Sequence, residues 1–562
     1  MKGKLFSVIF ILSILLFSNI QAAVYNITDF GAVADGKTVN TAAIQKAIDT
    51  CNGSGGGTVI VPAGTYITGT IRLLSFVNLH LESGAKLNGS TDLADYTYEG
   101  KRHGLIFAGD AVNISITGRG EINGNGTSFM TLDKSHISAD FVRARTRQGE
   151  KFMPETELFK DGPVAYEDRP GMLIVFLKCE NVHISDVTMT DSPEWTIRLG
   201  DCDNVTVRGI AILNNLLVPN SDGIHCTTSR NVRISDCDIR AGDDAIIVTG
   251  FGIDTDVHGD QSAGEAYSKR KTGNKTGYAE NITVTNCTLL SRSSGIRVGY
   301  GDNSIRNCVF QNLVIYSSNR GLGVFARDRG SIENILFSDI TINTRLHSGH
   351  WWGNGEPFHV SAIAQGGGYE LGRIKNVRFS NIFAEAETGI LVYGVPESPV
   401  EDVRFDNVQL KINNSPLNPD YGGNIDLRPT KSPETQIFQH DISGLFARYV
   451  NGLTISNFKL NWADELPDFF DFGLHIEQFN DLIIDGFIGR QPHLNDTRAA
   501  IALKNGDGVT VRNCVAAEGT GLFISAEWVA NAGLIVNNDI RRAKKMLEAV
   551  EAEFKADDNL YP

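Results

Sequence analysis

A short strand motif recurs along most of the chain and restricts the fold more than any other feature. Each copy opens with asparagine, an apolar residue, any residue and a second apolar residue. The copies start at Asn78, Asn113, Asn181, Asn204, Asn231, Asn281, Asn334 and Asn376, with weaker ones at Asp402 and Gly508. The closest copies are 23 and 27 residues apart. A strand-rich repeat of this length without helices between the copies is typical of a solenoid, because one coil cannot bury its apolar face alone.

Superposing the coils in sequence predicts which side chains share a column. The alignment starts from Trp195, Asp222, Asp244, Ser294, Arg320 and Thr388. Side chains alternate along a strand, so the aliphatic columns should face inward. A column of small residues that includes Gly223, Ala245 and Gly295 is predicted to face outward. A second outward column should contain Arg198, His225, Ile247, Arg297, Gly323 and Leu391.

Both ends and several interruptions of the repeat have patterns of their own. Ile44, Ala47 and Ile48 fall on one face of a short helix within 40–49, which should cap the N-terminal end. Apolar residues at helical spacing over 538–554 predict a C-terminal helix. Long loop insertions are expected at 125–170, 252–279, 344–372 and 412–440, and such insertions commonly form the walls of a groove.

Residues 1–22 have the charged, apolar and small-residue regions of a cleaved signal peptide, which leaves 23–562 as one β-helix domain. No later stretch is long and apolar enough to span a bilayer. We therefore expect an exported, soluble protein without a membrane partner, either periplasmic or secreted. The net charge of −15 argues against nucleic acid as a partner. Oligomeric state is not predicted.

Eight cysteines in an exported protein raise the question of disulfides. Cys237, Cys287, Cys308 and Cys514 occupy one slot of the repeat, and Cys179 and Cys202 occupy another. Small buried residues stacked in columns would look like this, so reduced core cysteines are favoured, with one or two bridges left open.

Three carboxylates are predicted to meet on one patch. Asp222 lies in Asn-Ser-Asp-Gly, and the pair Asp243 and Asp244 follows 21 and 22 residues later in Ala-Gly-Asp-Asp. Crowded acids raise one another's pKa, and hydrolysis of a glycosidic bond needs one protonated and one ionised carboxyl. Both strings also form turns, but their shared register favours a catalytic site.

These acid motifs and the opening Asp-Phe-Gly-Ala-Val-Ala-Asp-Gly of 29–36 resemble the polygalacturonase-like family, glycoside hydrolase family 28, from about residue 24 to about 410. The resemblance implies a right-handed parallel β-helix that cleaves pectin-like chains with inversion. It also implies that Asp243 is the general acid and that Asp222 and Asp244 position and deprotonate water. Acid and base should then lie about 6.5 to 9.5 Å apart.

Two motifs of that family are absent. Ser293-Ser294-Gly295 replaces Gly-His-Gly, and Gly323-Val324-Phe325 replaces Arg-Ile-Lys. In the family these residues bind the galacturonate carboxylate. Because they are replaced here, a substrate other than plain polygalacturonate is expected. Candidate substrate-binding residues are Asn220, Arg198, His225, Arg297, Trp351 and Trp352. Arg297 has the alternative of pairing with the acids, and the tryptophans that of anchoring their loop.

The leading hypothesis is an inverting glycoside hydrolase acting on an acidic, pectin-like polysaccharide or its oligosaccharides. The alternatives are a polysaccharide lyase with Arg297 as base, and a catalytically inactive carbohydrate-binding β-helix. No metal or cofactor is expected beyond a calcium ion at Asp254, Asp256 and Asp260, which lack an EF-hand frame.

Overall fold

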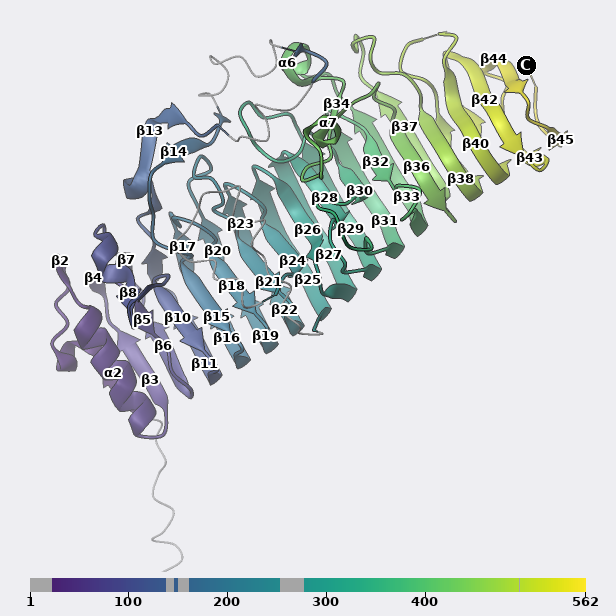
Figure 1. Ribbon diagram of the computed structural model, residues 1–562. Coiled ribbons are helices and arrows are strands. Elements are labelled where there is room, and N and C mark those ends of the chain that lie inside the picture. Colours follow the sequence, from purple (N-terminus) through teal and green to yellow (C-terminus); the bar gives the residue numbers. More distant parts are fainter. Residues whose placement is uncertain (1–22, 138–145, 150–160, 253–276, 495, 562) are drawn as a thin grey trace, which may run out of the picture.

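The computed structural model describes residues 23–137, 146–149, 161–252, 277–494 and 496–561. Over these residues 39 strands pair in parallel and wind into one long stack of coils (Figure 1). The fold is the predicted right-handed parallel β-helix. The predicted signal peptide, 1–22, lies outside the described residues. Within the described part of the chain, no helix is long and apolar enough to cross a membrane.

The coils present three faces, each a stack of parallel strands. The first, called here the site face, contains β5 (Ile71–Arg72), β10 (Ile106–Gly109), β15 (Ile174–Leu177), β18 (Ile197–Gly200), β21 (Ile224–Thr227), β24 (Ile246–Gly250), β26 (Ser294–Gly301), β28 (Arg320–Ala326), β30 (Phe358–Ala362), β32 (Ile390–Tyr393), β36 (Leu445–Asn451), β38 (Leu474–Asp485), β40 (Ala499–Arg512), β42 (Thr520–Ala530) and β44 (Ala543–Val550).

The second face contains β1 (Val24–Asn26), β3 (Gly57–Val61), β6 (Val77–Leu81), β11 (Val112–Gly118), β16 (Glu180–Ser185), β19 (Asp203–Arg208), β22 (Arg230–Ser235), β25 (Tyr278–Ser291), β27 (Ser304–Ser318), β29 (Ile332–Thr344), β31 (Ile374–Ala386), β33 (Val400–Ile412), β37 (Thr454–Trp462), β43 (Gly533–Val536) and β45 (Phe554–Asp557). The third contains β2 (Asp35–Val39), β4 (Gly64–Thr68), β7 (Ala85–Gly89), β12 (Glu121–Asn123), β17 (Thr188–Thr190), β20 (Ala211–Leu213), β23 (Asp238–Ala241), β39 (Ile488–Gly489) and β41 (Val515–Ala516). Long strands such as β25 pair with strands of two faces.

The recurring asparagine has a structural cause at the turn that leads into the second face. Its backbone is left-handed in successive coils, with φ of 55° at Asn204 and 58° at Asn281, a conformation that asparagine, aspartate and glycine adopt more readily than other residues. The amides also stack: Nδ2 of Asn204 donates to Oδ1 of Asn181 at 2.6 Å, and Asn281 donates to Asn231 at 3.1 Å. The weaker copies at Asp402 and Gly508 share this backbone conformation.

Strand pairing confirms the predicted outward column on the site face. Arg198 pairs with His225, His225 with Ile247, Ile247 with Arg297 and Arg297 with Gly323. The alignment missed one coil, because Gly323 pairs with His359 and His359 with Leu391. This coil contains β30 and lies inside the predicted third insertion. Its strand is hidden in the sequence by the loops on both sides.

The column of small residues faces inward, so that prediction was wrong. Ala245 is fully buried in the hydrophobic core. A Cβ atom on Gly223 would approach Ile239 Cγ2 to 2.7 Å, and one on Gly295 would approach Ile315 Cγ2 to 2.7 Å. The chain bends as it enters the site face, so two successive residues face the interior and the first must be small.

The two ends of the stack differ from each other. Helix α2 (Thr41–Gly53) covers the N-terminal coil and buries Ile44, Ala47 and Ile48, as predicted; it is one turn longer than predicted and also buries Cys51. The predicted C-terminal helix is wrong: β44 pairs with β42, and β45 pairs with β43, forming a further coil. The backbone there bonds to the open sheet edge, while only part of the apolar set is buried and Val550 stays 55% exposed.

The insertions carry short elements outside the main stack. They are η1 (Ile27–Phe30), η2 (Leu93–Tyr96), η3 (Gly126–Phe129), the hairpins β8 (Thr97–Tyr98) with β9 (Lys101–Arg102) and β13 (Met130–Ser135) with β14 (Val164–Tyr166), α6 (Asn418–Tyr421), β34 (Asn424–Asp426), α7 (Pro433–Gln436) and β35 (Ile437–Gln439). The second predicted insertion lies almost wholly outside the described residues.

All eight cysteines are buried and free, which confirms the prediction of reduced core cysteines. The neighbouring residues Asp238 and Thr288 pair, which places Cys237 beside Cys287. Cys308 pairs with Ile282 and therefore stands in a different column from the one predicted.

Candidate active site

Three carboxylates meet where the chain enters two neighbouring strands of the site face. Asp222 precedes β21, and Asp243 and Asp244 precede β24; the pairing of Ile224 with Ile246 brings Asp222 beside Asp244. One oxygen from each acid lies within 4.8 Å of the others. The side chains lie outside the hydrophobic core, yet the residues are only 3%, 6% and 1% exposed. The predicted clustering is therefore present in a nearly dry environment.

The neighbours of the acids distinguish Asp244 from the other two. Oδ1 of Asp244 accepts a hydrogen bond from the backbone N–H of Ser294 at 2.8 Å, and Oδ2 pairs with Arg297 Nη1 at 2.9 Å. This is the pairing that the sequence left open for Arg297. Asp243 Oδ1 accepts the backbone N–H of Asp244 at 3.0 Å, and Asn220 Nδ2 lies 3.5 Å from its other oxygen. Among the described residues, Asp244 alone of the three acids has a guanidinium in direct contact.

Burial and mutual repulsion favour the protonated form of the two remaining acids. Desolvation, followed by the charge of Asp244, raises the pKa of Asp243 to about 7, although Arg297 opposes the rise. Desolvation and the charges of Asp243 and Asp244 hold the pKa of Asp222 well above its usual range. The cluster can therefore hold a proton near neutral pH beside an ion-paired carboxylate, which acid/base chemistry requires.

Two residues that sequence reasoning missed support the cluster. Arg169 Nη1 donates to the carbonyls of Pro193 and Pro219, at 2.8 and 2.6 Å, and its Nη2 donates to Asn220 Oδ1 at 3.1 Å. This fixes the amide that faces Asp243. The buried Glu194 adds a negative charge that raises the pKa of Asp222. The sequence could have indicated Glu194 as a site residue, because it directly precedes Trp195 of the aligned column. Arg169 lies in an insertion, where the repeat gives no alignment.

Arg198 and His225 stand in the column beside the acids, but both are buried, at 2% and 0% exposure. The His225 ring lies 3.8 Å from that of Trp195, centroid to centroid, and its Nε2 is 3.1 Å from Thr249 Oγ1. The Phe251 ring lies 6.0 Å from the same histidine. These rings form an aromatic cluster in the column next to the carboxylates.

The positions that replace the family's basic motif are filled by other side chains. A Cβ atom on Gly323 would meet the Phe325 ring at 2.7 Å and Arg320 Cδ at 3.5 Å. The Arg320 guanidinium lies 4.9 Å from the centre of the Phe325 ring. An arginine side chain at position 323 would therefore have no room in the present packing.

The two tryptophans of the third insertion have structural contacts. Trp351 is 2% exposed, and its Nε1 donates to the carbonyl of Asp161 at 2.6 Å. Its assignment to substrate binding is thus not supported, because a buried ring offers no face to a sugar; the alternative of loop anchoring fits. Trp352 is half-buried and has the Arg428 guanidinium 4.5 Å from its ring centre.

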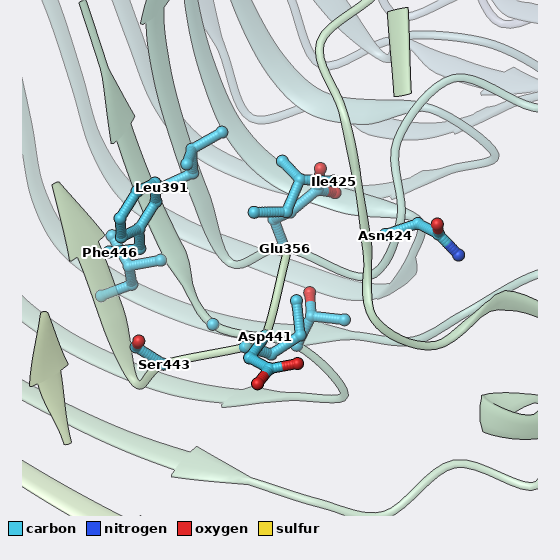
Figure 2. A pocket seen from close by; sticks show the side chains of 11 residues that line it. Glu356, Leu391, Asn424, Ile425, Asp441, Ser443 and Phe446 are labelled. Atoms are coloured by element: carbon cyan, nitrogen blue, oxygen red, sulfur yellow. The ribbon is translucent and has the colours of Figure 1, made fainter. Parts of the chain in front are cut away.

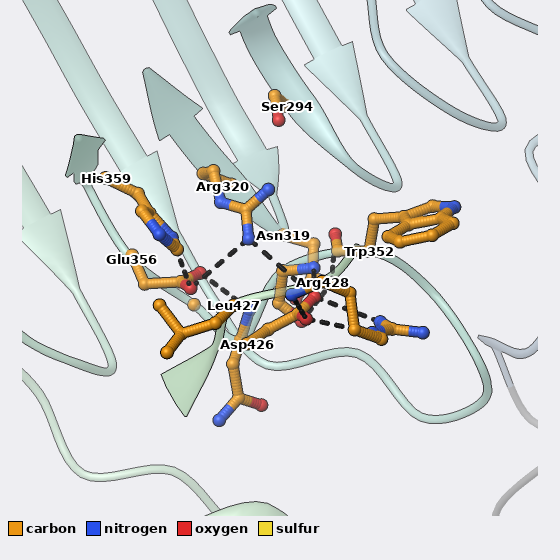
Figure 3. A network of polar contacts seen from close by, with 12 residues as sticks. Ser294, Asn319, Arg320, Trp352, Glu356, His359, Asp426, Leu427 and Arg428 are labelled. Atoms are coloured by element: carbon orange, nitrogen blue, oxygen red, sulfur yellow. Dashed lines mark hydrogen bonds and ion pairs between the residues drawn. The ribbon is translucent and has the colours of Figure 1, made fainter. Parts of the chain in front are cut away.

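A buried polar network joins the third and fourth insertions to the column of the acids (Figure 3). Arg320 continues this column beyond Ser294 and lies 3.4 Å from Glu356 and 3.8 Å from Asp426. Asp426 also pairs with Arg428 Nε at 2.8 Å and accepts the backbone N–H of Gly353 at 2.7 Å. The insertions therefore cover the column on the C-terminal side of the acids.

The carboxylate cluster has the spacing to hold a cation, since one oxygen of each acid lies within 4.8 Å of the others. The raised pKa values of Asp222 and Asp243 favour protons over a metal there. The calcium predicted at Asp254, Asp256 and Asp260 lies outside the described residues.

Comparison with protein families matches residues 51–418 to the model of the Glycosyl hydrolases family 28. The chain belongs to glycosyl hydrolase family 28. This family 28 chain is 31% identical over 264 residues to an exo-poly-alpha-D-galacturonosidase of Dickeya chrysanthemi, covering 41% of this chain and 43% of that protein. It is 30% identical over 241 residues to a probable polygalacturonase of Vitis vinifera, covering 40% and 43%. The matched part thus spans less than half the length of these relatives.

Two solved exopolygalacturonase structures share the fold. The exopolygalacturonase of Thermotoga maritima superposes with a TM-score of 0.55 at 22% identity, covering 79% of this family 28 chain and 93% of that one. The family 28 exopolygalacturonase of Yersinia enterocolitica gives a TM-score of 0.57 at 20% identity, covering 83% and 79%. At this identity the likeness concerns the β-helix alone.

Proposed function

We propose that this family 28 chain is an inverting glycoside hydrolase that cleaves a glycosidic bond in an acidic, pectin-like polysaccharide or its oligosaccharides. The observation that carries the proposal is the carboxylate cluster. Asp243, with a pKa raised to about 7, lies beside Asp244, which is ion-paired with Arg297 at 2.9 Å. An acid that keeps its proton next to a carboxylate that has lost one is the pair that glycoside hydrolysis requires.

In the proposed mechanism, protonated Asp243 donates its proton to the leaving glycosidic oxygen as the bond to the anomeric carbon breaks. The Asp244 carboxylate accepts a proton from the attacking water, and Asp222 helps to position that water. The dry surroundings strengthen these charge interactions, because little solvent screens them. Arg297 lies 2.9 Å from the Asp244 carboxylate and opposes its negative charge.

The spacing of the acids differs from the expectation for inversion. One oxygen of each lies within 4.8 Å of the others, short of the predicted separation of about 6.5 to 9.5 Å. Inversion is therefore tested separately, by following the anomer released in the first turnovers by proton NMR. The proposal requires the anomer opposite to that of the cleaved bond, and release of the same anomer would contradict it.

The substrate we propose is not plain polygalacturonate. The packing of Phe325 and Arg320 around Gly323 leaves no room for an arginine at the position where the family's Arg-Ile-Lys begins. Arg320 itself is ion-paired with Glu356 and Asp426. Arg297 is the cation nearest the acids on the next coil, so a uronic acid in another linkage, or a branched one, would meet positive charge there. The export pattern of residues 1–22 further supports action outside the cytoplasm, in the periplasm or in the medium.

A lyase on the same scaffold would use Arg297 as a base, but its salt bridge with Asp244 stabilises the protonated guanidinium. Product analysis on a panel of pectic oligosaccharides tests the proposal. We expect saturated reducing ends and no ultraviolet absorbance from unsaturated sugars. Unsaturated products would replace the proposal with a lyase, and a tightly bound but uncleaved oligosaccharide would replace it with a binding protein.

A further inference from the structure

A second cluster of ionisable side chains lies on the site face, five coils beyond Arg297. His475 and Glu477 belong to β38, and His440 directly follows β35 in the fourth insertion. The column runs from Arg297 through successive strand partners to His475. At about 4.8 Å per coil this places the cluster about 24 Å from Arg297 along the stack, and the acids lie one and two coils further away. It is therefore separate from the catalytic site.

We propose that His440, His475 and Glu477 form a binding site for zinc or a similar divalent transition metal. One ligand atom from each residue lies within 4.8 Å of the other two. Two imidazoles and one carboxylate are a common protein ligand set for zinc, with metal–ligand distances of about 2.0 to 2.2 Å. Such distances require ligands about 3.4 Å apart in a tetrahedron, which side-chain rotation of about 1 Å would achieve.

One hydrogen bond orients the His440 ring for metal binding. Its Nδ1 lies 2.5 Å from the carbonyl oxygen of Asp441, which can only accept, so Nδ1 carries the proton and Nε2 keeps its lone pair. Metal-binding histidines commonly use this arrangement, because the carbonyl fixes both the tautomer and the ring orientation. The ring also stacks on Phe446 at 4.4 Å, which limits its rotation.

The other two ligands, His475 and Glu477, lie close together on the same strand. Nε2 of His475 lies 3.2 Å from Glu477 Oε1, and the buried Nδ1 of the same ring has no hydrogen-bond partner in the described structure. Arg448, 3.9 Å from Glu477, would be displaced in part.

A metal at this site would fasten the fourth insertion to the stack. The insertion forms one side of a pocket whose other side is the site face, with Asn424 and Asp441 opposite Leu391 and Phe446 (Figure 2). The same insertion contributes Asp426 to the network that covers Arg320. A cross-link between His440 and β38 would therefore stabilise the insertion that covers Arg320 without touching the catalytic acids.

Equilibrium dialysis against zinc chloride, followed by metal analysis of the full chain, tests the inference. We expect one zinc per chain and at least tenfold weaker binding in His440→Ala and Glu477→Gln. His183→Ala, which removes an exposed histidine on β16, should bind as the unchanged protein does. Zinc retained undiminished in both cluster variants, or no retention by the unchanged protein, would overturn the proposal.

Two further measurements distinguish loss of the zinc site from misfolding of the variants and from zinc binding at the catalytic acids. Metal-free Glu477→Gln should unfold at the same temperature as the unchanged protein, whereas zinc should raise the Tm of the unchanged protein only. Cobalt(II) in place of zinc should give visible absorption bands typical of nitrogen ligands in the unchanged protein. Identical spectra in His440→Ala would place the ion elsewhere and contradict the inference.

Discussion

At the scale of single residues, Arg297 distinguishes Asp244 from the other two carboxylates. Its guanidinium neutralises Asp244, while Asp222 and Asp243 remain buried with raised pKa values. The sequence predicted which acids would meet, because the register of the repeat fixes it. The ion pair between Arg297 and Asp244 was one of two interpretations that the sequence left open. A strand pattern predicts the face of the sheet on which a side chain lies, but not the atom that it contacts.

The protonation of Asp243 predicts how the rate depends on pH. A general acid must be protonated, so kcat/KM should fall as pH rises through about 7, the value to which the pKa of Asp243 is raised. The positive charge of Arg297 lowers that pKa, so Arg297→Met should move the alkaline limb to higher pH, whatever it does to the maximal rate. Initial rates of both proteins over a pH series locate the alkaline limb of each. An alkaline limb that stays in place, or moves to lower pH, would contradict the assignment.

At the scale of the elements, the left-handed turn before each strand of the second face sets the register of the stack. Asparagine supplies both the backbone conformation and the amide that bonds to the next coil. The repeat motif was visible in the sequence, but the C-terminal coil was predicted to be a helix, because Ile540, Ala543 and Leu547 fit a helical period. The segment instead forms a strand that pairs with the open edge of β42. Pairing between strands that are distant in sequence cannot be predicted from local periodicity.

Substitution at one rung separates the two contributions of asparagine. Asn281→Ala should lower the free energy of unfolding by about 1–2 kcal/mol, since alanine disfavours a φ of 58° and removes the amide contact with Asn231. Asn281→Gly keeps the backbone conformation and should cost less. Denaturant unfolding of the three proteins gives the comparison. Equal losses in both variants would show that the backbone conformation contributes little.

At the scale of the whole molecule, three insertions from distant parts of the chain meet over one side of the site face. Asp161 binds Trp351, Arg428 Nη2 donates to the carbonyl of Trp351 at 2.6 Å, and Asp426 reaches Arg320. The insertions were predictable as breaks in the repeat. Their mutual contacts were not, because they depend on side chains without a repeating pattern, and the coil of β30 was lost between them.

The covered column predicts action from a chain end. Arg320 and Glu356 follow Ser294 in the column of the acids, and they are 4% and 3% exposed. A long polysaccharide could not continue across them, so short units should be released from one end of the substrate. Chromatography of early products should show a single small sugar while the average chain length falls slowly. A ladder of intermediate oligosaccharides at early times would contradict this.

We propose that Asp243 donates the proton that cleaves the glycosidic bond, and the Asp243→Asn variant tests this role. The amide has nearly the same shape but no transferable acidic proton. The turnover number on a cleaved oligosaccharide should fall by about 10² to 10⁴-fold, with an unchanged far-ultraviolet circular dichroism spectrum. A folded Asp243→Asn protein that keeps a substantial fraction of the original turnover would contradict the claim.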